Sequence, residues 1–422
     1  MDINAQYENH TTLSHLQSNV GPVQIAQALL DHGANINARN NGGETSLYPR
    51  LKGKYHIQCH DPVLHGVELV RDVGVNVQNK NHSTPLHLAS FYGALDLAKV
   101  LLDCGVTANS KDKLGRAPLH LVAEGKFNLE QDRIRLTQLL LELGVDVNAQ
   151  DDVSATPLHL ASYEGRVAIA RVLLDRGASV NSKDNQGRTP LHSVAEGRYL
   201  YSMDDSTRVA QLLLERGADV NALDEDNITP LHLASYYKKV EIARVLLDGD
   251  AATNPTANQG RTPLHVVAEG YSRDDDVLAQ LLLERGADID APDDDIQTPL
   301  HLASHFGRVR MAVVLLNAGA NASANNAQGQ TPLHLVSQSP HYSNGRGVGV
   351  AQLLLKHGAD VNAQDKNQAT PLDFASYHGR TNIASFLLLH GGKTNAIIDP
   401  RPTPLQQGLR RVRFYDEDYL PI

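Results

Sequence analysis

The sequence predicts an all-α solenoid, built from stacked helix–turn–helix units. A four-residue phrase, Thr-Pro-Leu-His or a near copy of it, starts at positions 12, 45, 84, 117, 156, 189, 229, 262, 298, 331, 370 and 403. Successive starts are separated alternately by 33 residues and by 36 to 40 residues. Within each unit, apolar residues recur at helical spacing. A fixed period in this range is typical of a stacked repeat array, so we expect a long surface that binds something.

The unit that begins at Thr156 shows the expected elements in order. Thr156 suits a helix N-cap, because its hydroxyl can accept a free backbone N–H, and Pro157 suits the first helical position. A short apolar inner helix follows and is broken at Gly165. A second, amphipathic helix comes next and ends at Gly177 in a left-handed cap. Residues 178–187 then form an extended finger that closes in a tight turn before the next phrase.

These units resemble the ankyrin repeat, a turn plus two antiparallel helices with a Thr-Pro-Leu-His signature. Gly-Ala-Asp-Val-Asn-Ala phrases at 217–222 and 358–363 add to a likeness that covers nearly the whole chain. The resemblance implies an ankyrin-repeat α-solenoid with β-hairpin fingers. We expect a partial finger at 1–11, about eleven repeats at 12–402 that alternate between short and long, and a partial capping repeat with a C-terminal tail at 403–422.

Composition narrows the classes of function. No apolar run in the 422 residues is long enough for a transmembrane helix, and the first thirty residues lack signal-peptide features. Two cysteines, Cys59 and Cys104, do not suggest a disulfide framework, so we expect a cytoplasmic protein, with the nucleus as the alternative. The formal net charge of −10 disfavours binding to nucleic acid and to anionic membranes. We therefore expect a monomer with protein partners and no integral membrane association.

Residues for catalysis or metal binding do not form a recognisable pattern. Nine of the twenty histidines belong to the repeated phrase, and the resemblance implies that they hydrogen-bond the finger to the helix: His15, His87, His120, His159, His192, His232, His265, His301 and His334. His56, Cys59, His60 and His65 cluster in the sequence, and we favour variable loop residues over a zinc site. No phosphate-binding loop or nucleophile elbow is present. We expect no enzyme activity, no cofactor and no metal.

The repeats alternate between two kinds. Odd repeats, which start at 84, 156, 229, 298 and 370, carry an aromatic residue after the inner-helix Leu-Ala-Ser. Even repeats, which start at 117, 189, 262 and 331, read Val-Ala-Glu-Gly or a variant there. The resemblance implies that these positions face a concave groove. We interpret the odd-repeat aromatics as partner-binding anchors, the alternative being that they pack on neighbouring helices: Phe91, Tyr92, Tyr163, Tyr236, Tyr237, Phe306 and Tyr377.

The finger tips alternate in charge. The tips before odd repeats carry the acidic residues Asp151, Asp152, Asp224, Glu225, Asp226, Asp293, Asp294 and Asp295, and those before even repeats carry Arg116, Arg188 and Arg261. In the last even repeat the arginine becomes Gln330 where the glutamate becomes Gln338, which indicates that Arg and Glu pair across the groove. Solvated charges are the alternative. The acidic tips favour a partner with a basic segment, and a merely solubilising surface is the other interpretation.

The extra residues of the even repeats predict long loops along one edge, at 126–133, 198–207, 271–276 and 339–349. This loop edge is a second candidate surface, with tolerated insertions as the alternative. Its notable side chains are Tyr199, Tyr201, Tyr271, Asp204, Asp205, Asp274, Asp275 and Asp276.

The sequence thus predicts a non-catalytic scaffold or adaptor that binds a partner segment in the groove. Two alternatives stay open. One is a substrate-targeting arm of a larger enzyme complex, such as a ubiquitin ligase. The other is a membrane or cytoskeletal tether.

Overall fold

The computed structural model describes residues 40–41, 76–125, 130–197, 203–339 and 346–395. These residues form nine pairs of α-helices, one pair for each repeat that starts between positions 84 and 370. They fall into two compact units, Met1–Asn258 and Gln259–Ile422, which are described separately. The repeats predicted at 12 and 45, the partial finger at 1–11 and the partial cap at 403–422 lie outside the described residues.

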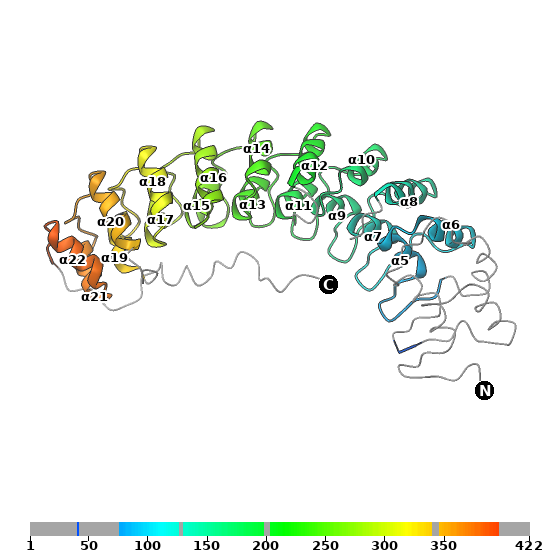
Figure 1. The fold of residues 1–422 in the computed structure, drawn as a ribbon, viewed down its shortest axis with the longest axis horizontal. Coiled ribbons are helices and arrows are strands. Elements are labelled where there is room, and N and C mark those ends of the chain that lie inside the picture. Colours follow the sequence, from blue (N-terminus) through cyan, green and yellow to red (C-terminus); the bar gives the residue numbers. More distant parts are fainter. Residues whose placement is uncertain (1–39, 42–75, 126–129, 198–202, 340–345, 396–422) are drawn as a thin grey trace. The chain divides into compact units, whose positions relative to one another are not determined.

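In the first unit the inner and outer helices form two rows (Figure 1). The inner helices are α5 (Pro85–Tyr92), α7 (Pro118–Glu124), α9 (Pro157–Tyr163), α11 (Pro190–Glu196) and α13 (Pro230–Tyr236). The outer helices are α6 (Leu95–Asp103), α8 (Glu130–Glu142), α10 (Val167–Asp175), α12 (Met203–Glu215) and α14 (Val240–Asp248). Each inner helix packs on its own outer helix and on the inner helices beside it, for example α9 on α10, α7 and α11.

The second unit repeats this arrangement (Figure 1). A short 3₁₀ turn, η3 (Asn258–Gly260), precedes its first inner helix. The inner helices are α15 (Pro263–Ala268), α17 (Pro299–His305), α19 (Pro332–Gln338) and α21 (Pro371–Tyr377). The outer helices are α16 (Arg273–Glu284), α18 (Val309–Asn317), α20 (Arg346–Lys356) and α22 (Thr381–Leu389).

The core follows the predicted apolar spacing. In α9 and α10, Leu158, Ile169, Ala170 and Leu173 are almost completely buried. Burying one such large aliphatic side chain contributes about 1.5–3 kcal/mol relative to exposure. Since each inner helix buries its apolar face against neighbouring repeats, stability comes from stacking.

The repeated phrase links each helix to the next finger. Thr156 occupies the N-cap position of α9, as predicted, but no backbone N–H bonds to its hydroxyl, which lies 2.9 Å from Nδ1 of His159. Its backbone N–H donates to Nδ1 of His159 at 3.1 Å, so the ring proton lies on Nε2, which donates to the carbonyl of Arg188 in the next repeat at 3.0 Å. Equivalent Nε2–carbonyl contacts of 3.0–3.2 Å recur at His87, His120, His192, His265, His301 and His334. The role that the resemblance implied is confirmed for these seven histidines, and His15 lies outside the described residues.

The fingers are tight turns. In the finger before Thr189, the N–H of Asp184 donates to the carbonyl of Arg188 at 2.9 Å, and Gly187 takes a left-handed φ of 76°. One backbone hydrogen bond joins this finger to the preceding one, from the N–H of Asn185 to the carbonyl of Val153 at 2.9 Å. A β-ladder needs a series of such bonds. The described residues accordingly contain no strand, in contrast to the expected β-hairpins.

The extra residues of even repeats are only partly loops. The outer helices of even repeats have 11 to 13 residues, whereas those of odd repeats have 9. Helix α12 already begins at Met203, inside the predicted loop 198–207, and α8 begins at Glu130, inside 126–133. Acidic residues in the first turn favour this early start, because they complement the positive end of the helix dipole. The long-loop prediction was therefore wrong for these helical residues.

Candidate protein-binding surface

Aromatic side chains lie at the C-terminal ends of the odd inner helices in the first unit. Phe91 and Tyr92 at the end of α5 form an edge-to-face pair, with ring centroids 5.3 Å apart. Tyr236 and Tyr237 at the end of α13 form the same kind of pair at 5.1 Å. Tyr236 is 39% exposed, and Phe91, Tyr92, Tyr163 and Tyr237 are half-buried. Edge-to-face packing fixes the rings while part of each surface stays accessible.

Histidine takes one place of this pair in the second unit. His305 pairs edge-to-face with Phe306 at 5.0 Å, and Tyr377 with His378 at 5.1 Å. Phe306 is half-buried and Tyr377 is 48% exposed. The aromatic positions predicted from the sequence are therefore partly packed against neighbouring rings and partly accessible, and their role as partner-binding anchors stays a prediction.

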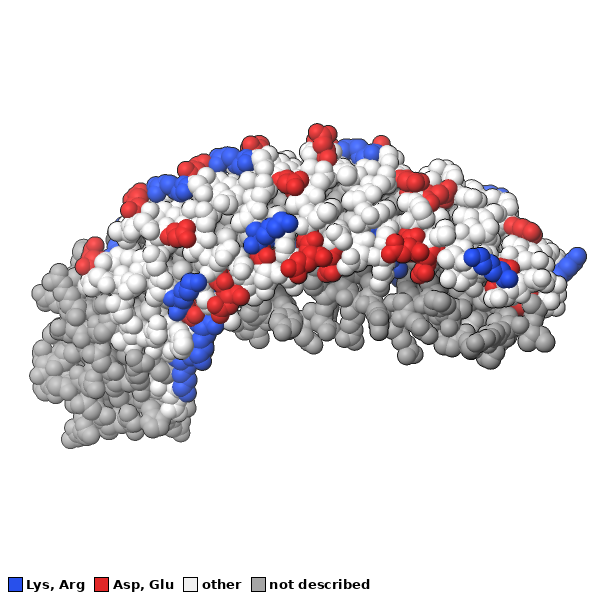
Figure 2. Space-filling model, turned by 180° about the vertical axis from the view of Figure 1, so that it is seen from behind, with Lys and Arg blue, Asp and Glu red and all other residues white. Residues whose placement is uncertain are grey.

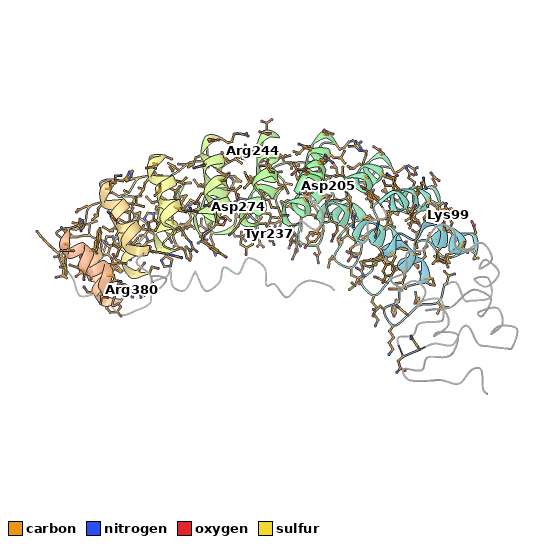
Figure 3. All side chains as sticks on the ribbon, viewed as in Figure 1. Lys99, Asp205, Tyr237, Arg244, Asp274 and Arg380 are labelled. Carbon is orange, nitrogen blue, oxygen red and sulfur yellow. The ribbon has the colours of Figure 1, made fainter. Side chains whose placement is uncertain are left out.

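The ring of Tyr237 belongs to a polar cluster on the inner-helix side of the first unit. Burial raises the pKa of Tyr237 far above its ordinary value, and the nearby Glu196 carboxylate raises it further. Arg188 and Tyr163 also lie close enough to act on this phenol. In Figure 3 Tyr237 lies on the side of the inner helices, opposite Arg244 on α14. At neutral pH its hydroxyl is protonated and can donate a hydrogen bond to a partner.

The arginine of each even finger pairs with the glutamate that follows its own inner helix or ends it. Arg188 Nη1 donates to the Glu196 carboxylate at 2.6 Å, and Arg188 Nε lies 3.4 Å from Asp184. Both side chains of the main pair are at least three-quarters buried. The same pair recurs between Arg116 and Glu124 at 2.7 Å and between Arg261 and Glu269. The predicted pairing of Arg with Glu is confirmed, and each arginine pairs with the glutamate at the end of the inner helix that directly follows it in the chain.

The last even repeat replaces this ion pair with amides. Gln330 and Gln338 are both buried, and Gln330 Oε1 lies 3.5 Å from Asn326 Nδ2. The joint change of Arg and Glu to Gln therefore avoids leaving one buried charge without its partner, which is costly.

The first residue of each acidic tip is structural. Oδ1 of Asp224 accepts the backbone N–H groups of Asp226 at 2.9 Å and Ile228 at 2.8 Å, which closes the turn. Asp151 and Asp293 accept in the same way. Burial raises the pKa of all three of these carboxyls. The exposed acidic residues are Asp152, Glu225, Asp226 and Asp294, whereas Asp295 is half-buried. A partner can therefore reach a smaller acidic surface than the sequence suggested.

Buried cations cap the ends of the even inner helices, and sequence reasoning missed them. Lys239, just before α14, is 2% exposed, and its Nζ donates to the carbonyls of Gly197 and, at 3.4 Å, Val194 at the end of α11. Burial lowers the pKa of Lys239 to about 8. Arg166 donates to the carbonyl of Gly125 in the same way, and Arg308 Nε donates to that of Glu269 at 2.7 Å.

A signal for these caps exists in the sequence. A basic residue directly precedes the outer helix in the odd repeats that start at 156, 229, 298 and 370: Arg166, Lys239, Arg308 and Arg380. A cation at this repeated position is suited to helix-end carbonyls, because these carry the negative end of the helix dipole.

The loop edge is a mixed surface. Tyr271 is 77% exposed, and the Arg308 guanidinium lies 5.3 Å from its ring centroid. Asp275 is buried and accepts the N–H of Ser272 at 2.7 Å as part of a capping box, so it is not a free acidic group. Asp204 and Asp274 are exposed, and Asp205 and Asp276 are half-buried. Tyr199 and Tyr201 lie outside the described residues.

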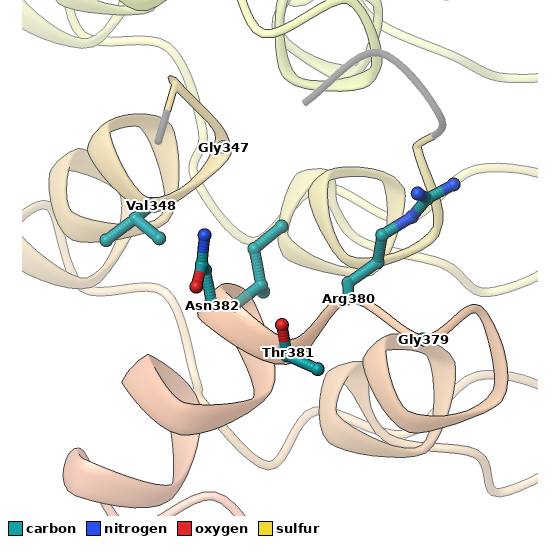
Figure 4. A pocket seen from close by; sticks show the side chains of 7 residues that line it. Gly347, Val348, Gly379, Arg380, Thr381 and Asn382 are labelled. Atoms are coloured by element: carbon teal, nitrogen blue, oxygen red, sulfur yellow. The ribbon is translucent and has the colours of Figure 1, made fainter. Parts of the chain in front are cut away.

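One pocket in the described residues lies in the second unit. A shallow pocket between the starts of α20 and α22 is lined by Gly347, Val348, Gly379, Arg380, Thr381, Asn382 and Ile383 (Figure 4). It contains a single charged side chain, whereas acid–base catalysis requires positioned titratable groups. Within the described ranges no three His, Cys, Asp or Glu side chains are placed to hold a metal. The cluster of His56, Cys59, His60 and His65 lies outside these ranges.

Two further properties of the described residues are their surface charge and the length of their helices. Acidic side chains lie among basic ones over the face in Figure 2. In the part of the chain that the structure describes, no helix is both long and apolar enough to span a membrane.

Family models match most of the chain. The model for ankyrin repeats in three copies matches residues 59–151, 128–222, 199–293 and 267–365. Two further ankyrin repeat models match residues 347–388 and 9–41. The chain belongs to the ankyrin repeat family. Ankyrin repeats are generally non-enzymatic modules of protein–protein interaction.

Several known ankyrin repeat proteins are similar over part of their length. Human ankyrin repeat and SOCS box protein 16 is 33% identical over 177 residues, which cover 41% of this chain and 38% of that protein. A putative ankyrin repeat protein of fowlpox virus, FPV024, is 30% identical over 27% of this chain and 19% of its own length. Human neurogenic locus notch homolog protein 1 is 32% identical over 34% of this chain and 5% of its own length. The chain thus spans well under half of each of these relatives.

Proposed function

We propose that this chain is a non-catalytic scaffold or adaptor that binds a segment of a partner protein. The binding surface is the inner-helix face of the first unit, defined by Tyr163, Tyr236, Tyr237 and the finger tips at 151–152 and 224–226. The observation that carries this proposal is the aromatic pair at the end of α13, which is fixed edge-to-face and still 39% exposed at Tyr236. Rigid aromatic side chains of this kind are typical anchors of protein interfaces.

Pre-organisation supports the proposal. Tyr237 is held edge-to-face by Tyr236, so little side-chain freedom is lost when a partner binds. The hydroxyl of this half-buried, protonated tyrosine adds a hydrogen-bonding group beside an apolar ring.

Charge favours a partner segment that contains Lys or Arg. Asp152, Glu225 and Asp226 are the exposed acidic residues of the two finger tips. Their potential attracts a basic segment and speeds its approach more than it strengthens the final complex. The aromatic side chains anchor the segment, and the acidic tips select it.

The experiment is affinity capture from native cell extract, followed by mass spectrometry. The intact chain is compared with the triple variant Tyr163→Ser, Tyr236→Ser and Tyr237→Ser, and circular dichroism checks that both stay folded. We expect a protein with a basic segment to be captured by the intact chain and lost from the variant. Equal capture by both would contradict the proposed surface.

A second candidate is the substrate-targeting arm of a larger enzyme complex such as a ubiquitin ligase. It is favoured by the similarity to a protein whose name includes a SOCS box, over 38% of that protein. The same capture experiment tests it, because ligase subunits would then be recovered together with the partner and would persist with the tyrosine variant.

A further inference from the structure

The last described helix pair leaves open a face that earlier odd repeats bury. The serine before the aromatic position is almost completely buried in the four preceding odd repeats, at Ser90, Ser162, Ser235 and Ser304. Ser376, at the same position of α21, is exposed. Since these residues occupy one register position in the same kind of helix, the difference comes from what lies beside the helix.

The outer helix shows the same change. Leu388 of α22 is 60% exposed, whereas its equivalents Leu247 and Leu316 are 7% and 3% exposed and Leu102 and Leu174 are half-buried. The next position, Leu389, is 84% exposed, but its equivalents are exposed too and are Asp or Asn: Asp103, Asp175, Asp248 and Asn317. Leu388 is therefore a stacking position without a neighbour, and Leu389 is an ordinary solvent position.

The chain beyond α22 enters a further finger in the normal register. Asn362 Oδ1 accepts the N–H of Lys393 at 2.7 Å, as Asn148 Oδ1 accepts that of Ser179 at 2.8 Å. The two contacts span the same 31 residues. Asn362 Nδ2 also donates to the carbonyl of Gly391 at 3.1 Å. The turn after α22 thus has the geometry that leads into a repeat elsewhere in the chain.

One residue adapts the junction. Asp373 replaces the histidine of the repeated phrase and cannot donate to a carbonyl when ionised. Its carboxylate instead accepts the N–H of Asn395 at 3.0 Å, and the Thr370 hydroxyl donates to the carbonyl of Lys393 at 2.7 Å. These contacts hold residues 393–395 against α21, next to the open face.

We propose that residues 403–414 of the same chain cover the face formed by Ser376 and Leu388. Thr403-Pro404-Leu405 stands 33 residues after Thr370, the step that separates each odd repeat from the following even repeat. The leucine of this phrase is at most 2% exposed in the described repeats, for example at Leu300, Leu333 and Leu372. Leu405, Leu409 and Val412 recur at helical spacing, so they supply an apolar stripe for this face.

The covalent connection favours this occupant over a second copy of the chain. Only residues 396–402 separate the anchored turn from Thr403. A short flexible connection gives an effective concentration in the millimolar range, on the order of 1 mM, which a separate molecule does not reach at ordinary protein concentrations.

Hydrogen exchange of α22 in the full chain tests the proposal. The variant Leu405→Asp is compared with Leu420→Asp, which lies outside the phrase, and α9 serves as the internal reference for folding. Burial of one leucine corresponds to about a 10- to 100-fold change in an equilibrium constant. We expect Leu405→Asp to speed exchange of the α22 amides by at least about tenfold and Leu420→Asp to leave it unchanged. Equal exchange in both variants would overturn the proposal.

A second pair of variants identifies the occupant. Leu388→Asp is expected to speed exchange of α21 as much as Leu405→Asp does, Leu389→Asp to have no effect, and Leu388→Asp to add nothing to Leu405→Asp. Light scattering over a range of concentrations completes the test. A dimer that Leu388→Asp dissociates would show that a second copy covers the face and would overturn the proposal.

Discussion

Odd and even repeats have the same architecture, a pair of α-helices, but their inner helices end differently. The odd inner helices α5 and α9 are followed by Gly93 and Gly165, which take left-handed φ values of 71° and 70°. The even inner helices α7 and α11 are followed by Gly125 and Gly197, which are not left-handed and have a φ of −48°. A left-handed residue satisfies the last carbonyls of its own helix. The even helices therefore need another donor.

Side chains of the next repeat supply donors, and at α7 Arg133 of the same repeat adds one, from its Nη1 to the carbonyl of Val122 at 3.0 Å. Lys239 and Arg166, which belong to odd repeats, bind the carbonyls at the ends of α11 and α7. A side chain at Gly197 would collide with the carbonyl of Tyr163, so the glycine of the even phrase is needed for close approach. The comparison teaches that each even repeat is joined to the odd repeats on both sides of it, to the following one through a buried cation and to the preceding one through close packing at its glycine. Even repeats place ion pairs at this end, and odd repeats place aromatic rings there.

The largest expected effect is the loss of stability in acid that comes from the buried histidines. Odd and even repeats both carry these histidines, so the difference between the two kinds of repeat is confined to their helix ends. Burial lowers the pKa of His120, His192, His265 and His301 to about 4 from 6.5. The unfolded chain therefore binds protons first, so stability is complete above pH 6.5 and falls as the pH falls toward 4. Each histidine is expected to cost about 2 kcal/mol between pH 7 and pH 5.

Urea unfolding at the two pH values, followed by circular dichroism, checks this expectation. The variant His192→Gln should lose about 2 kcal/mol less than the intact chain on acidification. His82→Gln, at an exposed position, is the control. Equal losses in all three proteins would contradict the assignment of the pH dependence to the buried imidazoles.

Removal of a capping cation tests whether the end of an even inner helix depends on the following odd repeat. Lys239→Met keeps the apolar stem but leaves the carbonyls of Val194 and Gly197 without a donor, and we expect a loss of about 2 kcal/mol. Lys99→Met is the matched control, because Lys99 is half exposed and forms only a weak, solvent-exposed ion pair with Asp96 at 3.9 Å. This variant should lower the free energy of unfolding by only about 0–0.5 kcal/mol. Urea unfolding measures both. Similar small losses would mean that the even helix end does not depend on its neighbour.

The ion pair of an even repeat can be converted to the two glutamines that the last even repeat carries at these positions, Gln330 and Gln338. Glu196→Gln alone leaves the Arg188 guanidinium without its main partner. Arg188→Gln alone leaves the Glu196 carboxylate without the guanidinium. We expect each single change to cost about 1–2 kcal/mol and the double change to cost about 1 kcal/mol less than their sum. A double-mutant cycle in urea measures this. Additive costs would show that the pair is not an energetic unit.

The acidic finger tip should divide into structural and surface residues. Asp224→Ala removes the acceptor for the N–H groups of Asp226 and Ile228, so it should lower stability by about 1 kcal/mol. Glu225→Gln together with Asp226→Asn should leave stability within about 0.5 kcal/mol but slow association with a captured basic partner severalfold at low salt, where the Debye length is long. Stopped-flow association at two salt concentrations checks this. A salt-independent rate would leave these residues as solubilising charges.

Local patterns in the sequence were sufficient for the fold. Thr156, Gly165 and Gly177 determine where the helices begin and end, so spacing alone predicted α9 and α10. The predicted β-hairpins were not confirmed, because the finger before Thr189 is joined to the preceding finger by a single backbone hydrogen bond, and local sequence does not determine how neighbouring fingers pair. The early start of α12 was missed for a related reason, since Asp204 and Asp205 were interpreted as loop charges.

The site could be predicted in part. The joint change to Gln330 and Gln338 correctly indicated Arg–Glu pairs, because paired charges must change together. Asp224 was expected to meet a partner, but it closes its own turn, and side-chain-to-backbone bonds of this kind cannot be distinguished from free charges by composition. Lys239 was missed because a single basic residue before a helix looks like a solvated charge until the neighbouring helix end is in place.

The central claim is that the ends of the odd inner helices bind a partner, whereas the ends of the even inner helices join neighbouring repeats. The most direct measurement is the affinity for one captured partner, by titration calorimetry, of two variants in parallel. One carries Tyr163→Ser, Tyr236→Ser and Tyr237→Ser, and the other carries Arg188→Gln and Glu196→Gln. The account predicts that the tyrosine variant loses at least about 30-fold in affinity with its helices intact, whereas the glutamine variant keeps its affinity to within about threefold. Loss of affinity in the glutamine variant with unchanged binding by the tyrosine variant would contradict it.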